Sequence, residues 1–220
     1  MAFAVTCVLS AQETAASKRL SAAATTVREI MEAGDKGVPQ DLLDSSSCVV
    51  VVPGLKKGAF IFGGKYGRGF LTCRNDNGLG WKAPASIRVE GGSFGFQIGG
   101  SETDVVMIVK SQKGADKMMQ SRFTLGGEAS VAGGPVGRNS TAMTDVQMRA
   151  EILSYSRSRG VFAGISLEGA TVREDQGANR ELYGKDISSK DVITTQPPVP
   201  AAAKELLDVL SKYSGRAGKS

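Results

Sequence analysis

Residues 48–81 read CVVVVPGLKKGAFIFGGKYGRGFLTCRNDNGLGW. The stretch opens with four valines, Val49 to Val52, which a proline and a glycine stop. Two further short apolar segments, Ala59 to Phe62 and Gly69 to Thr72, follow between glycines. Because β-branched and aromatic residues favour strands and glycine clusters favour turns, the stretch predicts short strands connected by turns.

Between Asp44 and Asp76 the charged residues of this stretch are all basic. A half-buried sheet that presents only positive charge to water suits an anionic partner, and the alternative is an ordinary solvated rim. The basic residues of the stretch are Lys56, Lys57, Lys65, Arg68 and Arg74.

The composition bounds the fold and excludes several chemistries. A chain of 220 residues with 41% hydrophobic content can bury a real core, and its net charge of +5 favours contact with phosphate or lipid headgroups. The chain contains no histidine, which removes the Ser-His-Asp and Cys-His nucleophile arrangements and most zinc sites. The GGSFG segment, 91–95, matches a nucleophile elbow, but without histidine it predicts a strand or turn. We therefore expect no enzyme, no cofactor and no bound metal.

Two adjacent carboxylates, Glu174 and Asp175, are the remaining candidates for acid–base work. They fall within Val172 to Tyr183, which has helical potential. Neighbouring residues on a helix point in different directions, so we expect this pair to lie on a solvated face.

The three cysteines show no metal-type spacing. Cys48 and Cys73 both fall in predicted strands and can form a disulfide if their Cα atoms approach within about 7 Å. Two separate buried thiols are the alternative. Cys7 stands apart from both.

The first residues, Met1 to Ala11, are apolar and end in small residues, as in the core and cleavage site of a secretory signal. The segment is too short to span a bilayer. The alternative is a disordered or packed N-terminus. The signal reading predicts a periplasmic or secreted protein that starts near Gln12.

The clearest predicted helix covers Glu13 to Ala33 and ends before Gly34. Its basic residues lie off the apolar stripe, so it can lie in a membrane interface or pack against the domain. The C-terminal part, 194–220, is a proline-rich connector, a second amphipathic helix over Ala201 to Tyr213 and a basic tail. The stripe of the first helix consists of Ala16, Leu20, Ala23, Val27, Ile30 and Met31.

The remaining pattern predicts an α+β domain over 12–193 with a strongly twisted antiparallel sheet, curving toward a barrel and flanked by helices. The continuous apolar run Asp104 to Lys110 predicts a central strand covered on both faces. The other predicted elements are short helices over Pro39 to Asp44 and Lys113 to Phe123, strands over Ser86 to Glu90, Phe94 to Ile98 and Leu125 to Val136, and a hairpin of Ala150 to Arg157 with Val161 to Leu167.

The ordered motifs from Ala15 to Val192 resemble the SYLF-domain family, which includes phosphoinositide-binding and actin-associated members as well as bacterial secreted ones. The segments that carry the resemblance are Lys18-Arg19 in the first helix, VVVPG at 50–54, GKYGRG at 64–69, WKAP at 81–84, FQIGG at 96–100, GPVGR at 134–138, YSRSRGVFAG at 155–164, Asn179 and Tyr183-Gly184.

The resemblance implies a non-enzymatic module that associates with anionic membrane lipid through its first helix and a basic surface. Partners would then be anionic phospholipid and an envelope protein, with no nucleic acid, and actin would not apply to a secreted chain. The other hypothesis is a protein-interaction or structural domain of the bacterial cell envelope. The candidate lipid-binding residues are Lys18, Arg19, Leu20, Val27, Arg28, Ile30, Met31, Lys56, Lys57, Lys65, Arg68, Arg74 and Arg138.

Overall fold

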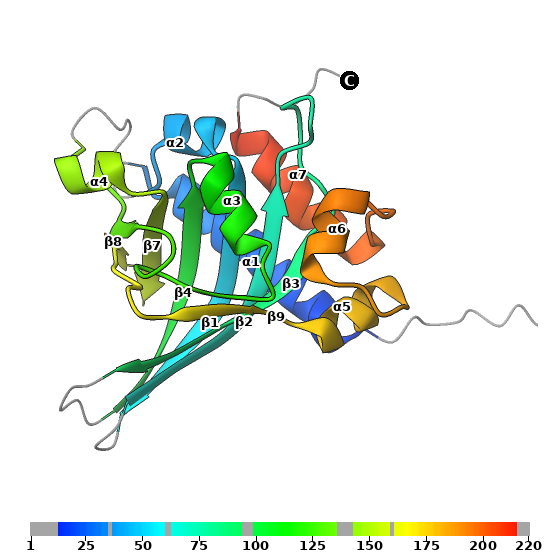
Figure 1. The fold of residues 1–220 in the computed structure, drawn as a ribbon, viewed down its shortest axis with the longest axis horizontal. Coiled ribbons are helices and arrows are strands. Elements are labelled where there is room, and N and C mark those ends of the chain that lie inside the picture. Colours follow the sequence, from blue (N-terminus) through cyan, green and yellow to red (C-terminus); the bar gives the residue numbers. More distant parts are fainter. Residues whose placement is uncertain are drawn as a thin grey trace, which may run out of the picture.

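The computed structural model contains a strongly curled, mostly antiparallel sheet that forms a half-barrel, flanked by helices (Figure 1). Neighbouring strands run in the order β5-β9-β3-β2-β1-β4-β7-β6, and β8 pairs with β7. This architecture confirms the predicted α+β class with a twisted sheet. The structure describes residues 13–34, 37–59, 63–93, 99–135, 143–158 and 161–214.

The strands carry most of the long-range pairing. All named strand pairs are antiparallel except β6 with β7, which are parallel. The strands are β1 (Cys48–Ala59), β2 (Gly63–Cys73), β3 (Ala85–Ser93), β4 (Gly99–Val109), β5 (Arg122–Thr124), β6 (Val131–Gly133), β7 (Ile152–Ser158), β8 (Val161–Gly164) and β9 (Thr171–Glu174).

The helices lie on both faces of this sheet. The helices α1 and α7 pack on each other and cover one face together with α2, while α3 and α6 pack on the other. The helices are α1 (Ala15–Glu32), α2 (Gln40–Ser45), α3 (Gln112–Met118), α4 (Asp145–Arg149), α5 (Gln176–Tyr183), α6 (Ser189–Thr195) and α7 (Lys204–Tyr213), which a 3-10 turn (Ala201–Ala203) precedes.

Alternate residues of the central strands feed two separate cores. In β1, Val50 and Val52 belong to the core under α3 and α6, whereas Val49 and Val51 belong to the core under α1 and α7. Residues 105–109 of β4 alternate in the same way and are buried on both sides. The prediction of a central, doubly covered strand at Asp104 to Lys110 is therefore confirmed.

The prediction that the valine strand stops at Pro53 is wrong. The strand β1 continues to Ala59, with register shifts against both neighbours around Pro53 and Gly54. Proline is tolerated at such an irregularity because no ladder hydrogen bond is required there. Gly54 adopts φ +63°, and its N–H donates to Asp104 Oδ1 at 2.9 Å. A bulge thus replaces the predicted turn.

Beyond this bulge, β1 to β4 extend past the helices as a curved projection (Figure 1). We call residues 54–58 and 64–68 of β1 and β2 the projecting hairpin.

The strands β1 and β2 approach closely at Gly69, where a Cβ atom would lie 2.1 Å from the carbonyl oxygen of Val51. Only glycine fits there, which supports the expectation that glycines permit the bends of this sheet.

Two predicted helices are shorter than expected. The helix over Lys113 to Phe123 ends at Met118, and Phe123 is buried in β5 instead. Val172 belongs to β9, and α5 begins only after Asp175, whose Oδ1 accepts from the Ala178 N–H. In both places a strand pairing overrides the local helical pattern.

The other predicted elements are mostly found. The helix pattern at Pro39 to Asp44 corresponds to α2, and β7 with β8 forms the predicted hairpin. Of Leu125 to Val136, only Val131–Gly133 is a named strand. The predictions for Met1 to Ala11, for the strand at Phe94 to Ile98 and for Arg138 lie outside the described residues.

Candidate anion-binding surface

Three lysines gather on the projecting hairpin. Lys57 is directly opposite Lys65 in the antiparallel register, and Lys56 is opposite Tyr66. Lys56 is exposed, whereas Lys57 and Lys65 are half-buried. Partial burial, and secondly the charge of Lys65, lower the pKa of Lys57. Within the part of the chain that the structure describes, none of these lysines forms an ion pair. Lys56 is opposite Glu102 of β4, so the charges of Lys57 and Lys65 are the most available to an anion.

Arg68 connects the hairpin with α5. Its Nε donates to the Tyr66 hydroxyl at 2.8 Å and lies 3.3 Å from Asp175 Oδ2. The hydrogen bond to Tyr66 and the charge of Asp175 raise the pKa of Arg68. The Asp175 carboxylate is nearly buried, so the expectation that it lies on a solvated helix face is wrong.

The basic residues of α1 contribute unequally to this surface. Lys18 is exposed and Arg19 is half-buried at the start of the helix. There the N–H of Ala16 donates to Glu181 Oε1, which lowers the pKa of Glu181, with a smaller contribution from Arg19. Arg28 instead forms an ion pair with Glu205 of α7 at 3.1 Å. Lys18 and Arg19 are thus the basic residues of α1 that remain most open to an external anion.

The apolar stripe of α1 belongs to the core. Leu20, Val27 and Ile30 are 0%, 3% and 1% exposed, and Met31 is partly buried against the same core. The helix begins at Thr14, whose hydroxyl accepts from the Ser17 N–H, and then packs on β1 and α7. Of the two alternatives for this helix, the structure shows packing against the domain, because the sheet and α7 cover these side chains.

Arg74 is a structural residue and not part of the surface. It is buried, its guanidinium lies 3.9 Å from the ring centre of Trp81, and it donates to the Leu43 carbonyl and to Ser214 Oγ. A stacked and hydrogen-bonded guanidinium of this kind stabilises the packing of α2 and α7 against the sheet. Its prediction as a lipid contact is wrong because the side chain is buried against these partners.

The open question of Cys48 and Cys73 is answered by the β1–β2 register. The two residues are directly opposite each other and form a disulfide. The disulfide closes a loop that contains the entire projecting hairpin. It therefore fixes the base from which the three lysines project.

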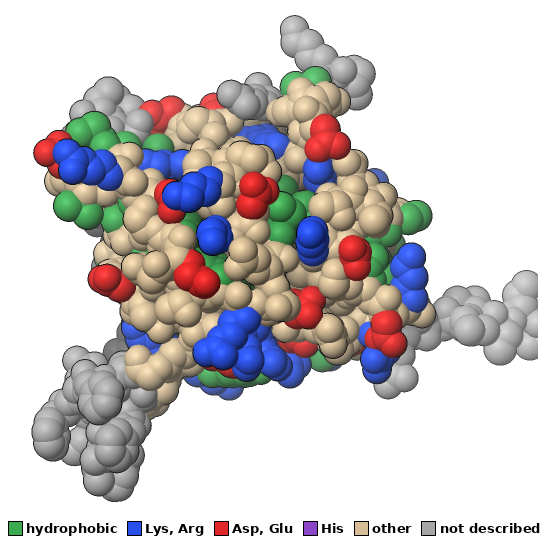
Figure 2. All heavy atoms as spheres, in the orientation of Figure 1, with side chains coloured by type: hydrophobic (Ala, Val, Ile, Leu, Met, Phe, Trp, Pro, Cys, Tyr) green, Lys and Arg blue, Asp and Glu red, His purple; other side chains and the backbone are tan. Residues whose placement is uncertain are grey.

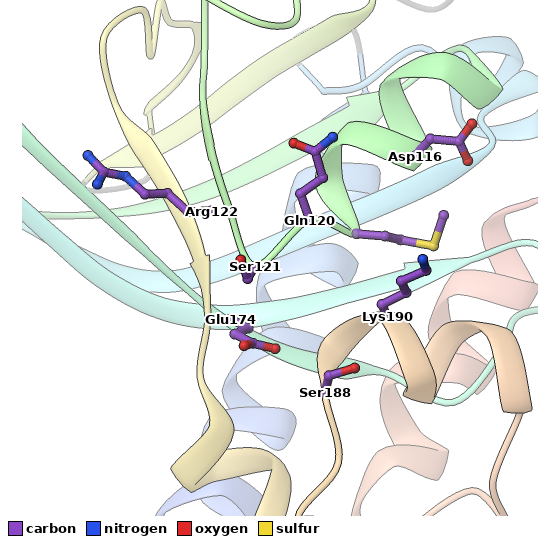
Figure 3. Close-up of a pocket in the computed structure, with 8 residues that line it drawn as sticks. Asp116, Gln120, Ser121, Arg122, Glu174, Ser188 and Lys190 are labelled. Atoms are coloured by element: carbon purple, nitrogen blue, oxygen red, sulfur yellow. The ribbon is translucent and has the colours of Figure 1, made fainter.

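A hollow of about 630 Å³ lies between α3, β5, β9 and α6 (Figure 3). Its Glu174 carboxylate accepts from Gln176 Nε2 and the Ser189 N–H, while the Arg122 side chain extends away from Glu174 and Lys190. Glu174 is thus engaged in local hydrogen bonds. Among the described residues, no group of three metal-ligating side chains is assembled.

The chain combines a curled half-barrel with an exposed basic projection. The family model described as Ysc84, Las17-binding protein actin regulator, matches residues 90–213. The chain belongs to this family, which confirms the SYLF resemblance.

Relatives from fungi and mammals show the same similarity. The chain is 39% identical over 177 residues to an SH3 domain-containing protein of Schizosaccharomyces pombe, covering 79% of this chain and 41% of that protein. It is 34% identical over 179 residues to protein YSC84 of Saccharomyces cerevisiae, covering 80% and 38%. It is 32% identical over 181 residues to the SH3 domain-containing YSC84-like protein 1 of Homo sapiens, covering 82% and 52%. The chain thus spans about two-fifths to one-half of these relatives.

Proposed function

We propose that this chain is a non-enzymatic module that binds anionic membrane lipid through the lysines of the projecting hairpin. The observation that carries the proposal is the set of three lysines without an ion pair among the described residues, on strands that extend past the helices. Phosphoinositide-like headgroups are the lipid class that this concentration of charge suits. No helix of the described part is long and apolar enough to cross a membrane.

The electrostatics support reversible surface binding. Each basic residue near an anionic leaflet contributes about 1 kcal/mol, so three lysines together give about 3 kcal/mol. Lys57 and Lys65 repel each other in the free protein. This repulsion is the second cause of the lowered pKa of Lys57, and partial burial is the larger one. A phosphate between them would replace that repulsion by two attractions.

In this proposal α1 acts by charge and not by insertion. Lys18 and Arg19 add long-range attraction to an anionic surface, while the apolar stripe stays packed against the sheet. Insertion of Leu20 or Ile30 would remove buried side chains from the core, which costs about 2–5 kcal/mol for each by analogy with truncation. The hairpin requires no such rearrangement.

The test is co-sedimentation of the full chain with phosphatidylcholine vesicles that contain or lack phosphatidylserine, over a salt series. We expect binding only to the anionic vesicles, with loss as the Debye length shortens. Equal binding to neutral vesicles, or binding that salt leaves unchanged, contradicts the proposal.

A protein-interaction role is the second candidate. The matching family is described as Las17-binding and actin-regulating, and α4 has no buried residue, with Val146 and Met148 70% and 56% exposed. Recovery of a stoichiometric protein partner by cross-linking, without any vesicle binding, would favour this role.

We also propose an oxidising compartment, periplasmic or secreted, where the partner would be an envelope protein. The Cys48–Cys73 disulfide supports it because such bonds persist there.

A further inference from the structure

Four arginines stand in one row across four neighbouring strands. Arg68 of β2 is directly opposite Arg88 of β3, and Arg88 is opposite Arg173 of β9. Arg173 is in turn opposite Arg122 of β5. Directly opposite residues of antiparallel strands project from the same face, and neighbouring strands lie about 4.8 Å apart. The four residues, which we call the arginine ladder, therefore span about 14 Å of one sheet face.

Carboxylates neutralise only part of this row. Asp175 lies 3.3 Å from Arg68, and Glu90 lies 3.0 Å from Arg88 and 3.6 Å from Arg173. Arg122 has no ion pair among the described residues. Glu174, next to Asp175, also lies beside the row, so four positive charges face three negative ones. Like charges directly opposite each other destabilise a sheet, so an anionic ligand among Arg88, Arg122 and Arg173 would relieve two unfavourable pairs.

Three rungs of the ladder line one hollow. Arg88, Arg122 and Arg173 surround a space of about 350 Å³ together with Gln176 and Gly177, the first residues of α5. Basic side chains gather along the lower edge of this face, in the region that β9 crosses (Figure 2). The hollow therefore combines several guanidinium groups with the positive end of a helix dipole.

The other polar groups of the hollow leave room for an anion. The N–H groups of Gln176 and Gly177 have no acceptor within the described ranges. The two carboxylates that also line the hollow already have partners: Glu174 accepts from Gln176 Nε2 and the Ser189 N–H, and Asp175 caps α5. The unused hydrogen-bonding capacity is mainly that of donors.

We infer that this hollow binds a monoester or terminal phosphate group of an anionic ligand. Arginine forks bind phosphate oxygens in bidentate fashion, and backbone N–H groups at a helix start complete such sites. The hollow is lined by none of the hairpin lysines, so the inference stands without membrane binding. The same chemistry occurs in a soluble polyphosphate and in a phosphorylated lipid headgroup.

The test measures binding of inorganic pyrophosphate to the full chain by titration calorimetry, and its effect on the Tm by thermal unfolding. We expect wild type to bind and its Tm to rise, and we expect Arg122→Gln to weaken binding about tenfold, as for one charge-assisted hydrogen bond. Arg122→Gln should fold normally because the side chain has no ion pair among the described residues. The matched control is Arg149→Gln, an exposed arginine of α4, which should bind as wild type does.

Vesicles distinguish the two sources of phosphate. A preference for phosphatidic acid over phosphatidylserine that Arg122→Gln removes assigns the hollow to a lipid headgroup. Pyrophosphate binding without such a preference assigns it to a soluble ligand. No pyrophosphate binding by wild type, or an equal loss in the two arginine variants, overturns the inference. Failure of the hairpin proposal would appear separately, as vesicle binding that loss of the hairpin lysines leaves unchanged.

Discussion

Replacement of Lys56, Lys57 and Lys65 together by glutamine is expected to weaken binding to phosphatidylserine vesicles about 100-fold at low salt. Three lysines at about 1 kcal/mol each give about 3 kcal/mol, and each 1.4 kcal/mol is a tenfold change in Kd. The fold should persist, because none of the three is fully buried or forms an ion pair among the described residues. Circular dichroism and co-sedimentation of the full chain measure the two effects.

A matched triple substitution separates position from net charge. Lys117, Lys185 and Lys204 lie on α3, after α5 and on α7, and their replacement by glutamine removes the same three charges. At the same salt concentration, we expect this control to change the apparent Kd less than threefold, since charges far from the contact are partly screened. If both triples weaken binding equally, general charge attracts the protein and the hairpin is not the contact.

Loss of the disulfide should have the largest effect on stability. Replacement of Cys48 and Cys73 by serine is expected to lower the free energy of unfolding by about 3 kcal/mol. The bond spans a sequence separation of 25 residues, and its loss frees the loop in the unfolded chain. Two hydroxyls would also replace nearly buried sulfur atoms. Urea unfolding of the full chain measures the difference.

Reduction of the wild type provides the control for this substitution. A thiol reductant should shift the urea midpoint of wild type downward and leave the double serine variant unchanged. Replacement of Cys7 by serine should preserve the shift. A wild-type midpoint that reductant does not move would contradict the pairing of Cys48 with Cys73.

Local pattern was sufficient for the elements with strong periodicity. The stripe of α1 predicts a helix and the uninterrupted apolar run of β4 predicts a strand, and both elements are found. The course of β1 past Pro53 was not, because it depends on the bond from the Gly54 N–H to Asp104, fifty residues away. Likewise the local pattern around Val172 favours a helix, but pairing with β3 and β5 places this residue in a strand.

The surface was predictable only where exposure follows from local sequence. The stretch without acidic residues located the hairpin lysines. It also included Arg74, which is buried in contact with Trp81 and the Leu43 carbonyl. The arginine ladder has no local signature. Its members are far apart in the sequence, and only the register of four strands brings them into one row.

The most direct test of the central claim is hydrogen exchange of the full chain with and without phosphatidylserine vesicles. Contact through the projecting hairpin predicts slower exchange at residues 54–58 and 64–68, while residues 20–30 of α1 keep their exchange rates because the helix stays in the core. Altered exchange in α1 with an unchanged hairpin would contradict the account and show that the helix leaves the sheet to meet the membrane.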